Sequence, residues 1–169
     1  NDGRATISVQ GIDMIFTRCD AERGKMGGCE IYFTKRKGQT WDEPKLIPLS
    51  GDSFTVGQPS LSPDEQTLYF VSDMPGGQGG KDIWMTVYDK KKKAWGEVSN
   101  LGNKVNTELD EMFPSITSDG TLYFASKGHN SMGGYDIFKS VLDPATNSFG
   151  PAVNLDFAIN TPDDDIFYI

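Results

Sequence analysis

A repeat of 54 residues runs through this sequence and constrains its fold more than any other feature. The run Thr67–Phe70 (TLYF) recurs unchanged as Thr121–Phe124. Large aromatic residues mark one point of each repeat at the same spacing, at Trp41, Trp95 and Phe149. A repeat of this length is one supersecondary unit, which buries its apolar faces by stacking on its neighbours.

Each repeat contains four runs rich in aromatic and β-branched residues, bounded by Gly, Pro, Asp and Asn, which is typical of strands. In TLYF both alternating sets of side chains are apolar or aromatic, so both faces of that strand are expected to be buried between neighbouring sheets. The sequence therefore predicts an all-β fold, a β-propeller with three four-stranded blades at residues 5–49, 58–101 and 113–155. The expected strands are 5–9, 14–18, 30–35 and 41–47, then 60–62, 67–72, 82–89 and 95–101, then 115–117, 121–126, 136–142 and 149–155.

The last residues predict the start of a further blade. The segment Asn160–Phe167 (NTPDDDIF) has the same form as Asn106–Phe113 (NTELDEMF), so residues 165–169 are expected to begin a fourth blade. Closed propellers have about four to eight blades, and three cannot close a ring. We expect a longer protein that supplies more blades, six or so in all; the alternative is that two copies form one ring.

Composition and charge narrow the classes of partner. The formal net charge of −8 argues against nucleic acid and anionic membranes, because phosphate binding needs clustered Lys and Arg. The one basic run, Lys90–Lys93, is expected at a solvated hairpin tip. No apolar run approaches the roughly 18 residues of a membrane span, so no membrane insertion is expected. The chain begins at Asn1, and we expect it to be a mature or excised piece of something longer.

The two cysteines, Cys19 and Cys29, fall at the end of the second expected strand and the start of the third. Those strands pair as a hairpin, so a disulfide across the loop is geometrically plausible and is favoured over two free thiols. Such a bond suits an oxidising compartment such as a periplasm.

The patterns that support catalysis are weak, and we expect no enzyme, no cofactor and no metal. The only histidine, His129, is expected to be an ordinary exposed loop residue without catalytic partners. Zinc is disfavoured because two cysteines and one distant histidine give no complete ligand set. Acids that recur once per blade, Asp82 and Asp136, with Glu30 at the equivalent position, are expected to accept structural hydrogen bonds.

One group of residues is a candidate binding site. In a propeller, the loops that join strands two and three lie at the same face as the blade-to-blade connections. Glycine loops at 24–28, 76–80 and 128–134 would therefore lie beside acidic residues able to bind a cation or a basic segment of a partner. The alternative, which we favour, is that Asp110 and Asp164 brace the connections by accepting hydrogen bonds from backbone amides. The candidate acids are Glu108, Asp110, Glu111, Asp163, Asp164 and Asp165.

The runs 59–73 (PSLSPDEQTLYFVSD), 79–84 (GGKDIW), 114–128 (PSITSDGTLYFASKG) and 133–138 (GGYDIF) resemble the WD-like, TolB-type propeller repeats of bacterial cell-envelope proteins. They are most similar to the propellers of OmpA-like envelope proteins of Bacteroidota, including PorE-like members of the type IX secretion apparatus. The resemblance implies a periplasmic, outer-membrane-associated protein whose partners are envelope or secretion proteins. It implies peptidoglycan binding only through a domain outside these residues.

Three functions are compatible with these patterns. The first is a non-catalytic protein-interaction scaffold in an envelope or type IX secretion assembly. The second is a glycan-binding or hydrolytic propeller that uses the acidic loops of its central face. The third is the propeller of a peptidase whose catalytic domain lies outside these residues. The fold supports all three, because one blade architecture serves many roles.

Overall fold

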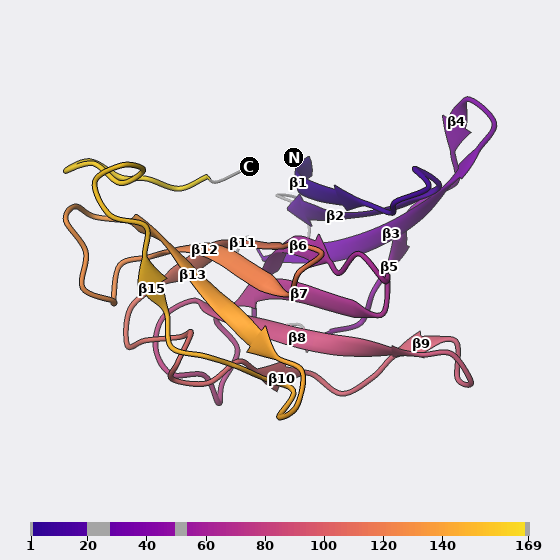
Figure 1. The fold of residues 1–169 in the computed structure, drawn as a ribbon. Coiled ribbons are helices and arrows are strands. Elements are labelled where there is room, and N and C mark those ends of the chain that lie inside the picture. Colours follow the sequence, from indigo (N-terminus) through magenta and orange to yellow (C-terminus); the bar gives the residue numbers. More distant parts are fainter. Residues whose placement is uncertain (1, 20–27, 50–53, 168–169) are drawn as a thin grey trace.

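The computed structural model describes residues 2–19, 28–49 and 54–167, which form three antiparallel sheets in sequence order (Figure 1). Each sheet is a meander of three long strands, and two short strands pair with the third long one. The first sheet holds β1 (Asp2–Ile7), β2 (Asp13–Cys19), β3 (Cys29–Lys37), β4 (Thr40–Trp41) and β5 (Lys45–Leu46). The second holds β6 (Val56–Leu61), β7 (Thr67–Ser72), β8 (Asp82–Asp89), β9 (Ala94–Trp95) and β10 (Ser99–Asn100). The third holds β11 (Glu111–Ile116), β12 (Thr121–Ser126), β13 (Asp136–Asp143), β14 (Ser148–Phe149) and β15 (Val153–Asn154).

The expected fourth strand of each blade is interrupted. Each of the three expected runs consists of two short strands separated by three residues, 42–44, 96–98 and 150–152. At each gap a hydroxyl group of the third strand donates to the carbonyl group of the first gap residue. The bonds are Thr34 Oγ1 to Asp42 O at 2.6 Å, Thr86 Oγ1 to Gly96 O at 3.0 Å and Ser140 Oγ to Gly150 O at 2.6 Å. A side chain thus replaces the backbone bond that the gap removes.

The first strands of the last two sheets start earlier than predicted. The sequence predicts starts at residues 60 and 115, whereas β6 starts at Val56 and β11 at Glu111. Gln58 and Phe113, each followed by proline, have positive φ angles of 53° and 55°, and the strand register shifts there. These bulges break the alternation of side chains, which is why the sequence pattern reveals only the second half of each strand.

The core lies between the sheets and is divided by β7. Leu68 and Phe70 pack into a cluster between the first and second sheets, and both are 0% exposed. Tyr69 and Val71 point the other way, into a cluster shared with the third sheet. The prediction that both faces of this strand are buried is confirmed.

The aromatic markers behave differently in the three sheets. Phe149 is buried and its ring lies 5.8 Å from that of Tyr69 in the preceding sheet, and Trp95 packs against the cluster between sheets one and two. Core packing was expected for all three rings, but Trp41 is 40% exposed. In this fold each marker packs on the sheet before its own, and no sheet precedes the first one within the 169 residues.

Polar side chains connect neighbouring sheets at their first and second strands. Thr17 Oγ1, on β2, accepts a hydrogen bond from Gln58 N at 2.8 Å, and Gln58 Oε1 accepts one from Phe113 N at 2.7 Å. Two further bonds of this kind run from Leu61 N to Thr6 Oγ1 and from Ile116 N to Ser60 Oγ, each at 3.2 Å. They place β1, β6 and β11 side by side.

Two further predictions concern the chain ends and the cysteines. Ile166 and Phe167 belong to no strand, and residues 168–169 lie outside the described residues, so the expected strand at 165–169 is not formed in the part that is described. A strand needs a paired neighbour, and none of the described strands pairs with residues 165–167. Cys19 and Cys29 form the predicted disulfide and are direct cross-strand partners on β2 and β3.

Nowhere in the described ranges is there a helix with the length and apolarity needed to cross a bilayer.

Candidate functional site

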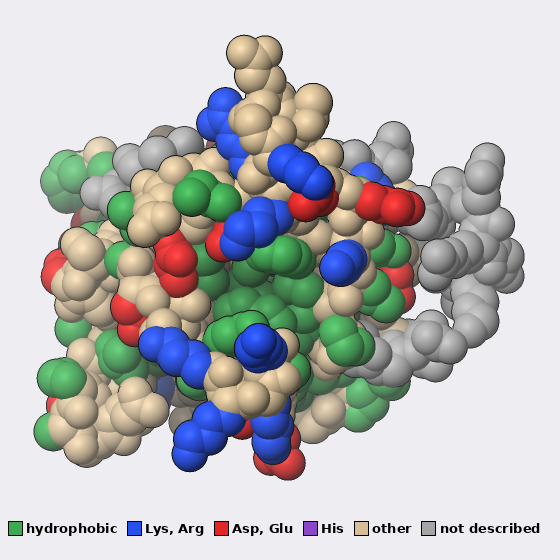
Figure 2. Space-filling view, turned by 90° about the vertical axis from the view of Figure 1, so that its right-hand side faces the viewer, with side chains coloured by type: hydrophobic (Ala, Val, Ile, Leu, Met, Phe, Trp, Pro, Cys, Tyr) green, Lys and Arg blue, Asp and Glu red, His purple; other side chains and the backbone are tan. Residues whose placement is uncertain are grey.

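The turns of the sheets gather at two opposite ends of the molecule. We call one the loop end; it contains the loops between second and third long strands and the connections between sheets, residues 73–81, 101–110, 127–135 and 155–165. The other, the hairpin end, contains the turns after β1, β3, β6, β8, β11 and β13. Figure 2 shows the hairpin end, where Lys and Arg side chains surround an apolar depression. Exposed lysines there include the run Lys90–Lys93, at the hairpin tip where it was expected.

Two of the six candidate acids brace the connections at the loop end. Asp110 Oδ1 accepts a hydrogen bond from Lys81 N, and Asp164 Oδ1 accepts one from Tyr135 N, both at 2.9 Å. The carbonyl groups of Lys81 and Tyr135 in turn accept hydrogen bonds from the backbone amides of residues 111 and 165, both at 2.7 Å. Each aspartate therefore binds a connection to the adjacent glycine loop, as the favoured alternative predicted.

Burial and the Asp110 carboxylate also affect Tyr135. Its hydroxyl group donates to Asp110 Oδ2 at 3.3 Å, and the ammonium group of Lys127 lies 4.4 Å from the centre of its ring. Burial, and then the negative charge of Asp110, raise the pKa of Tyr135 to about 12. The phenol is therefore neutral at physiological pH and acts here as a hydrogen-bond donor.

Glu111 is not a surface acid, which corrects its place in the candidate site. It is the first residue of β11 and is 0% exposed. Its carboxylate accepts bonds from Thr107 N and Thr107 Oγ1, both at 2.7 Å, and from Ser126 Oγ at 2.5 Å. Asp165, one repeat later, accepts the equivalent bonds from Thr161 N and Thr161 Oγ1 at 2.6 and 3.1 Å. The sequence could not separate these acids from surface ones, because a buried and an exposed carboxylate look the same in an acidic run.

Replacing Glu111 with glutamine is expected to change how stability depends on pH. Burial raises the pKa of Glu111 above its usual value of 4.5, despite the three hydrogen bonds that favour the ionised form. The folded state therefore keeps this proton at pH values where the unfolded chain has released it, so stability falls as pH rises from the usual value through the raised one. Glu111→Gln removes that loss, and its stability relative to the unsubstituted protein should increase with pH.

Urea unfolding of both proteins at several pH values between about 4 and 8 measures this difference. Glu108→Gln, which changes an exposed acid three residues away, is the matched control. Its free energy of unfolding should change with pH in the same way as that of the unsubstituted protein. If the difference in free energy of unfolding between Glu111→Gln and the unsubstituted protein stayed constant with pH, the expectation would be contradicted.

A buried network of asparagine and aspartate side chains holds the loop end together. Of its members, the sequence pattern indicated only the aspartates. Asn106 Oδ1 accepts from Ile83 N at 2.8 Å, Asn106 Nδ2 donates to Ile83 O at 2.9 Å, and the same amide donates to Asn100 Oδ1 at 3.0 Å. Asn100 Nδ2 donates to Asp82 Oδ2 at 2.9 Å. The third sheet repeats the network with Asn160, Ile137, Asn154 and Asp136. Its signal was available, since Asn100 and Asn154, like Asn106 and Asn160, are 54 residues apart.

The aspartates of this network also close the glycine loops, as expected for structural acceptors. Asp82 accepts from Gln78 N, and Asp136 accepts from Met132 N at 2.7 Å. The glycines themselves permit a close approach: a Cβ at Gly79 would lie 2.3 Å from a backbone atom of Glu108, and one at Gly133 would lie 2.5 Å from Asp163 O. The repeated Gly-Gly pairs are therefore explained by contact with the connections.

His129 is half-buried, which corrects the expectation of an exposed loop residue. Its Nε2 lies 2.8 Å from Val105 O, and its ring packs 5.1 Å from that of Phe138. The histidine thus packs at the edge of the core beside the third sheet. The polar residues around it in the sequence do not indicate these aromatic contacts, because they form only in the folded protein.

The exposed part of the loop end combines carboxylates with apolar side chains. The side chains of Glu108 and Asp163 are exposed, as is most of Asp164. On the loops and connections of the same end, Leu109 is 52% exposed, Met132 49% and Phe157 86%. Asn103, which occupies the position of Phe157 one repeat earlier, is also exposed although a further sheet follows it. The exposure of Phe157 therefore does not depend on the absence of a following sheet.

A cavity of about 240 Å³ lies where β1, β6 and β11 meet at the loop end. Its walls are mainly apolar, with the Cys19–Cys29 disulfide, Val71 and Phe113 among them. Among the described residues, the charged ones that line it are Arg4, Lys81 and Asp73. None of the six candidate acids does so, and the expected central glycine loop at 24–27 lies outside the described residues. The centre of this end is thus not an acidic ring.

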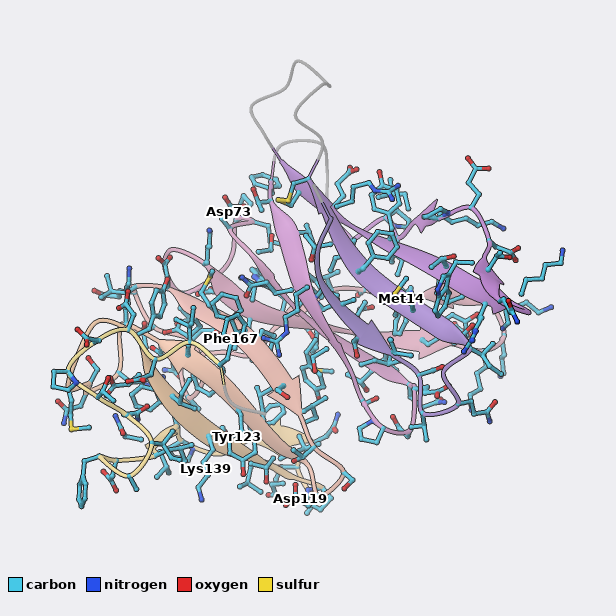
Figure 3. All side chains as sticks on the ribbon, turned by 90° about the horizontal axis from the view of Figure 1, so that it is seen from above. Met14, Asp73, Asp119, Tyr123, Lys139 and Phe167 are labelled. Atoms are coloured by element: carbon cyan, nitrogen blue, oxygen red, sulfur yellow. A yellow bond between two sulfur atoms is a disulfide. The ribbon has the colours of Figure 1, made fainter. Side chains whose placement is uncertain are left out.

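Arg4 is the chemically distinctive residue of this cavity. Its guanidinium lies 5.8 Å from the ring centre of Phe113 and 5.7 Å from that of Phe167, and Figure 3 shows Phe167 towards the middle of the molecule. The Nη1 atom is buried and has no hydrogen-bond acceptor among the described residues. Burial lowers the pKa of Arg4, but a guanidinium stays charged at neutral pH. No group of three or more His, Cys, Asp or Glu side chains suited to a metal ion occurs within the described ranges.

Comparisons with known proteins identify the fold. No protein-family model and no curated protein sequence matches the chain. Among solved structures, TolB from Acinetobacter baumannii is similar at a TM-score of 0.55 and 17% identity over 89% of this chain and 32% of its own. A puromycin-hydrolyzing peptidase from Mycobacterium tuberculosis is similar at 0.57 and 19%, over 92% of this chain and 22% of its own. A luciferin-regenerating enzyme is similar at 0.55 and 13%, over 95% of this chain and 50% of its own.

These similarities, together with the three antiparallel sheets, define the chain as a partial β-propeller of the type found in TolB and in peptidases. The fold prediction is confirmed. The chain spans half or less of the length of each of these structures. At such low identity the similarity concerns the fold alone, and function has to be argued from this chain's own residues.

Proposed function

We propose that this partial propeller is a non-catalytic protein-interaction module. The observation that carries the proposal is the set of exposed apolar side chains at the loop end, Leu109, Met132 and Phe157, on loops that also expose Glu108 and Asp163. Exposed apolar groups with polar neighbours are typical of protein-binding surfaces, and aromatic residues often dominate the binding energy.

The loops that carry these side chains are fixed in place. Asp110, Asp164 and the buried Asn–Asp networks bind the connections to the sheets, and the glycine loops pack against the connections without space for a side chain. A preorganised surface of this kind loses little conformational entropy on binding. The exposed carboxylates favour a partner with basic residues around an apolar contact.

The cellular setting belongs to the same proposal. We place the module in the periplasm, associated with the outer membrane, as a scaffold in an envelope or type IX secretion assembly. The Cys19–Cys29 disulfide supports an oxidising compartment weakly, since such bonds persist mainly outside the cytosol. The resemblance of the repeats to those of OmpA-like envelope proteins supports the assembly.

A second function, the propeller of a peptidase, has one observation in its favour. One of the similar solved structures is a puromycin-hydrolyzing peptidase, of which this chain covers 22%. In that case the catalytic residues would lie outside these 169 residues. A catalytic domain in the flanking sequence, together with hydrolysis of peptide substrates by the purified full-length protein, would favour this function over the interaction module. A glycan-binding or hydrolytic role has no comparable support, because Asp110 and Glu111 bind the protein's own backbone and hydroxyl groups.

Chemical crosslinking in isolated cell envelopes, followed by affinity capture, tests the proposal. A partner captured by the unsubstituted protein should be lost with Phe157→Asp. Val9→Asp is the matched control, because Val9 is 78% exposed in the turn after β1 at the hairpin end. A partner that both variants retain, or that both lose, would contradict binding at the loop end.

A further inference from the structure

The cavity at Arg4 combines features that no structural role for its residues accounts for. Apolar walls surround the guanidinium of Arg4, a half-buried residue whose Nη1 atom is buried and has no acceptor among the described residues. A guanidinium has five N–H donors, and leaving a buried charged donor without a partner is unfavourable. The rings of Phe113 and Phe167, 5.8 and 5.7 Å from the guanidinium carbon, attract its charge but supply no hydrogen-bond acceptor for its N–H groups.

The chemistry of the cavity selects an anion with a planar pair of acceptors. Among the described residues its lining holds two cations, Arg4 and Lys81, against one carboxylate, and Asp73 Oδ1 already accepts a hydrogen bond from Thr55 N at 2.8 Å. A carboxylate pairs with guanidinium through two parallel hydrogen bonds, which are stronger than those between neutral groups. A cationic ligand would face Arg4 without compensation.

Size and polarity specify the rest of the ligand. A volume of about 240 Å³ is smaller than the roughly 300–1,000 Å³ of cavities for drug-sized molecules. It suits one apolar side chain together with its carboxylate. The walls that such a side chain would contact are Val71, Met112, Phe113 and the disulfide.

We propose that this cavity binds an apolar carboxylate, with the carboxylate paired to Arg4 and the apolar group against Val71 and Met112. The carboxylate is either that of a small acylated amino acid or the C-terminus of a peptide. The site is separate from the interaction surface, because neither Phe157 nor Leu109 lines the cavity. The proposal therefore stands or falls independently of the protein-interaction function.

NMR titration of the ¹⁵N-labelled protein tests the proposal with matched acid and amide probes. N-acetyl-leucine is expected to bind about tenfold more tightly than N-acetyl-leucinamide, since one charge-assisted pairing is worth about 1.5 kcal/mol or more. The backbone signals of Gly3, Gly57 and Val71 should shift. The acetylated peptide Ala-Ala-Ala-Leu, as acid and as amide, distinguishes the sources: tighter binding of the peptide acid assigns a chain terminus, and equal binding assigns a small molecule.

Substitutions assign the effect to Arg4. Arg4→Met keeps the apolar stem of the side chain and should abolish the preference for acid over amide, whereas Arg4→Lys should keep part of it. Arg18→Met is the matched control, because Arg18 also lies over two aromatic rings, Phe16 and Tyr32 at 5.2 Å each, but does not line the cavity. Equal binding of acid and amide, absence of binding by either, or a preference that survives Arg4→Met in a folded variant would overturn the proposal.

Discussion

Replacing Asn106 with alanine is expected to lower the free energy of unfolding by about 4 kcal/mol. The side chain is 1% exposed and binds both backbone groups of Ile83, accepting from its N–H and donating to its carbonyl group. Alanine leaves both of these buried groups without a partner, and each unsatisfied group costs about 1–3 kcal/mol. It also removes the donor to Asn100 Oδ1, which disturbs the link to Asp82.

Urea denaturation at neutral pH measures this loss as a lower midpoint with an unchanged slope. Asn103→Ala is the matched control, because Asn103 is exposed and lies three residues earlier in the same connection; its effect should stay within about 0.5 kcal/mol. Asn160→Ala should reproduce the large loss, since Asn160 binds Ile137 in the same way. A loss of under about 1 kcal/mol for Asn106→Ala would show that the network is not the main restraint on the connection.

Removing the disulfide is expected to cost about 3 kcal/mol of stability. The bond closes a loop between residues 10 apart, and closing a loop of that size in the unfolded chain is worth about this much in the chain-entropy model. For a domain of this size, 1 kcal/mol corresponds to about 2–4 °C in Tm, so the protein with both Cys19→Ala and Cys29→Ala should melt about 6–12 °C lower.

Thermal unfolding with and without dithiothreitol provides the control. The reductant should lower the Tm of the unsubstituted protein towards that of the double variant and leave the double variant unchanged. If dithiothreitol left the unsubstituted protein unaffected after the thiols were shown to be free, the disulfide would have no stabilising role. Weak support for an oxidising compartment would then also be lost.

Much of the fold was readable from the sequence because a repeat reports the same local physics several times. The alternation in TLYF, the Gly, Pro, Asp and Asn residues that bound the expected strands and the spacing of the aromatic markers predicted three sheets and their order. The cysteine pair followed from the same alignment, since cross-strand neighbours in a hairpin lie close enough to bond. What the pattern missed were irregularities, the bulges at Gln58 and Phe113 and the broken fourth strands, where local chemistry replaces the regular hydrogen bonds.

The candidate site could be predicted only in part. The sequence identified the acids of the connections and the alternative that Asp110 and Asp164 bind backbone amides, which the structure shows. It did not separate buried Glu111 from exposed Glu108, although the two lie three residues apart. Burial depends on which side of the connection meets the neighbouring strands, and a run of acids does not encode that.

The sequence by itself determined the repeat, the all-β class and the residues that turn and pack each blade, because these depend on contacts close along the chain. The tertiary structure alone decided what lies at the meeting point of the blades. Arg4, Val71 and Phe113 come from three different sheets, and their cavity exists only once β1, β6 and β11 lie side by side. The strands that meet there are one repeat apart, but the equivalent positions hold different residues, Arg4, Gln58 and Phe113, so the repeat does not reveal the site.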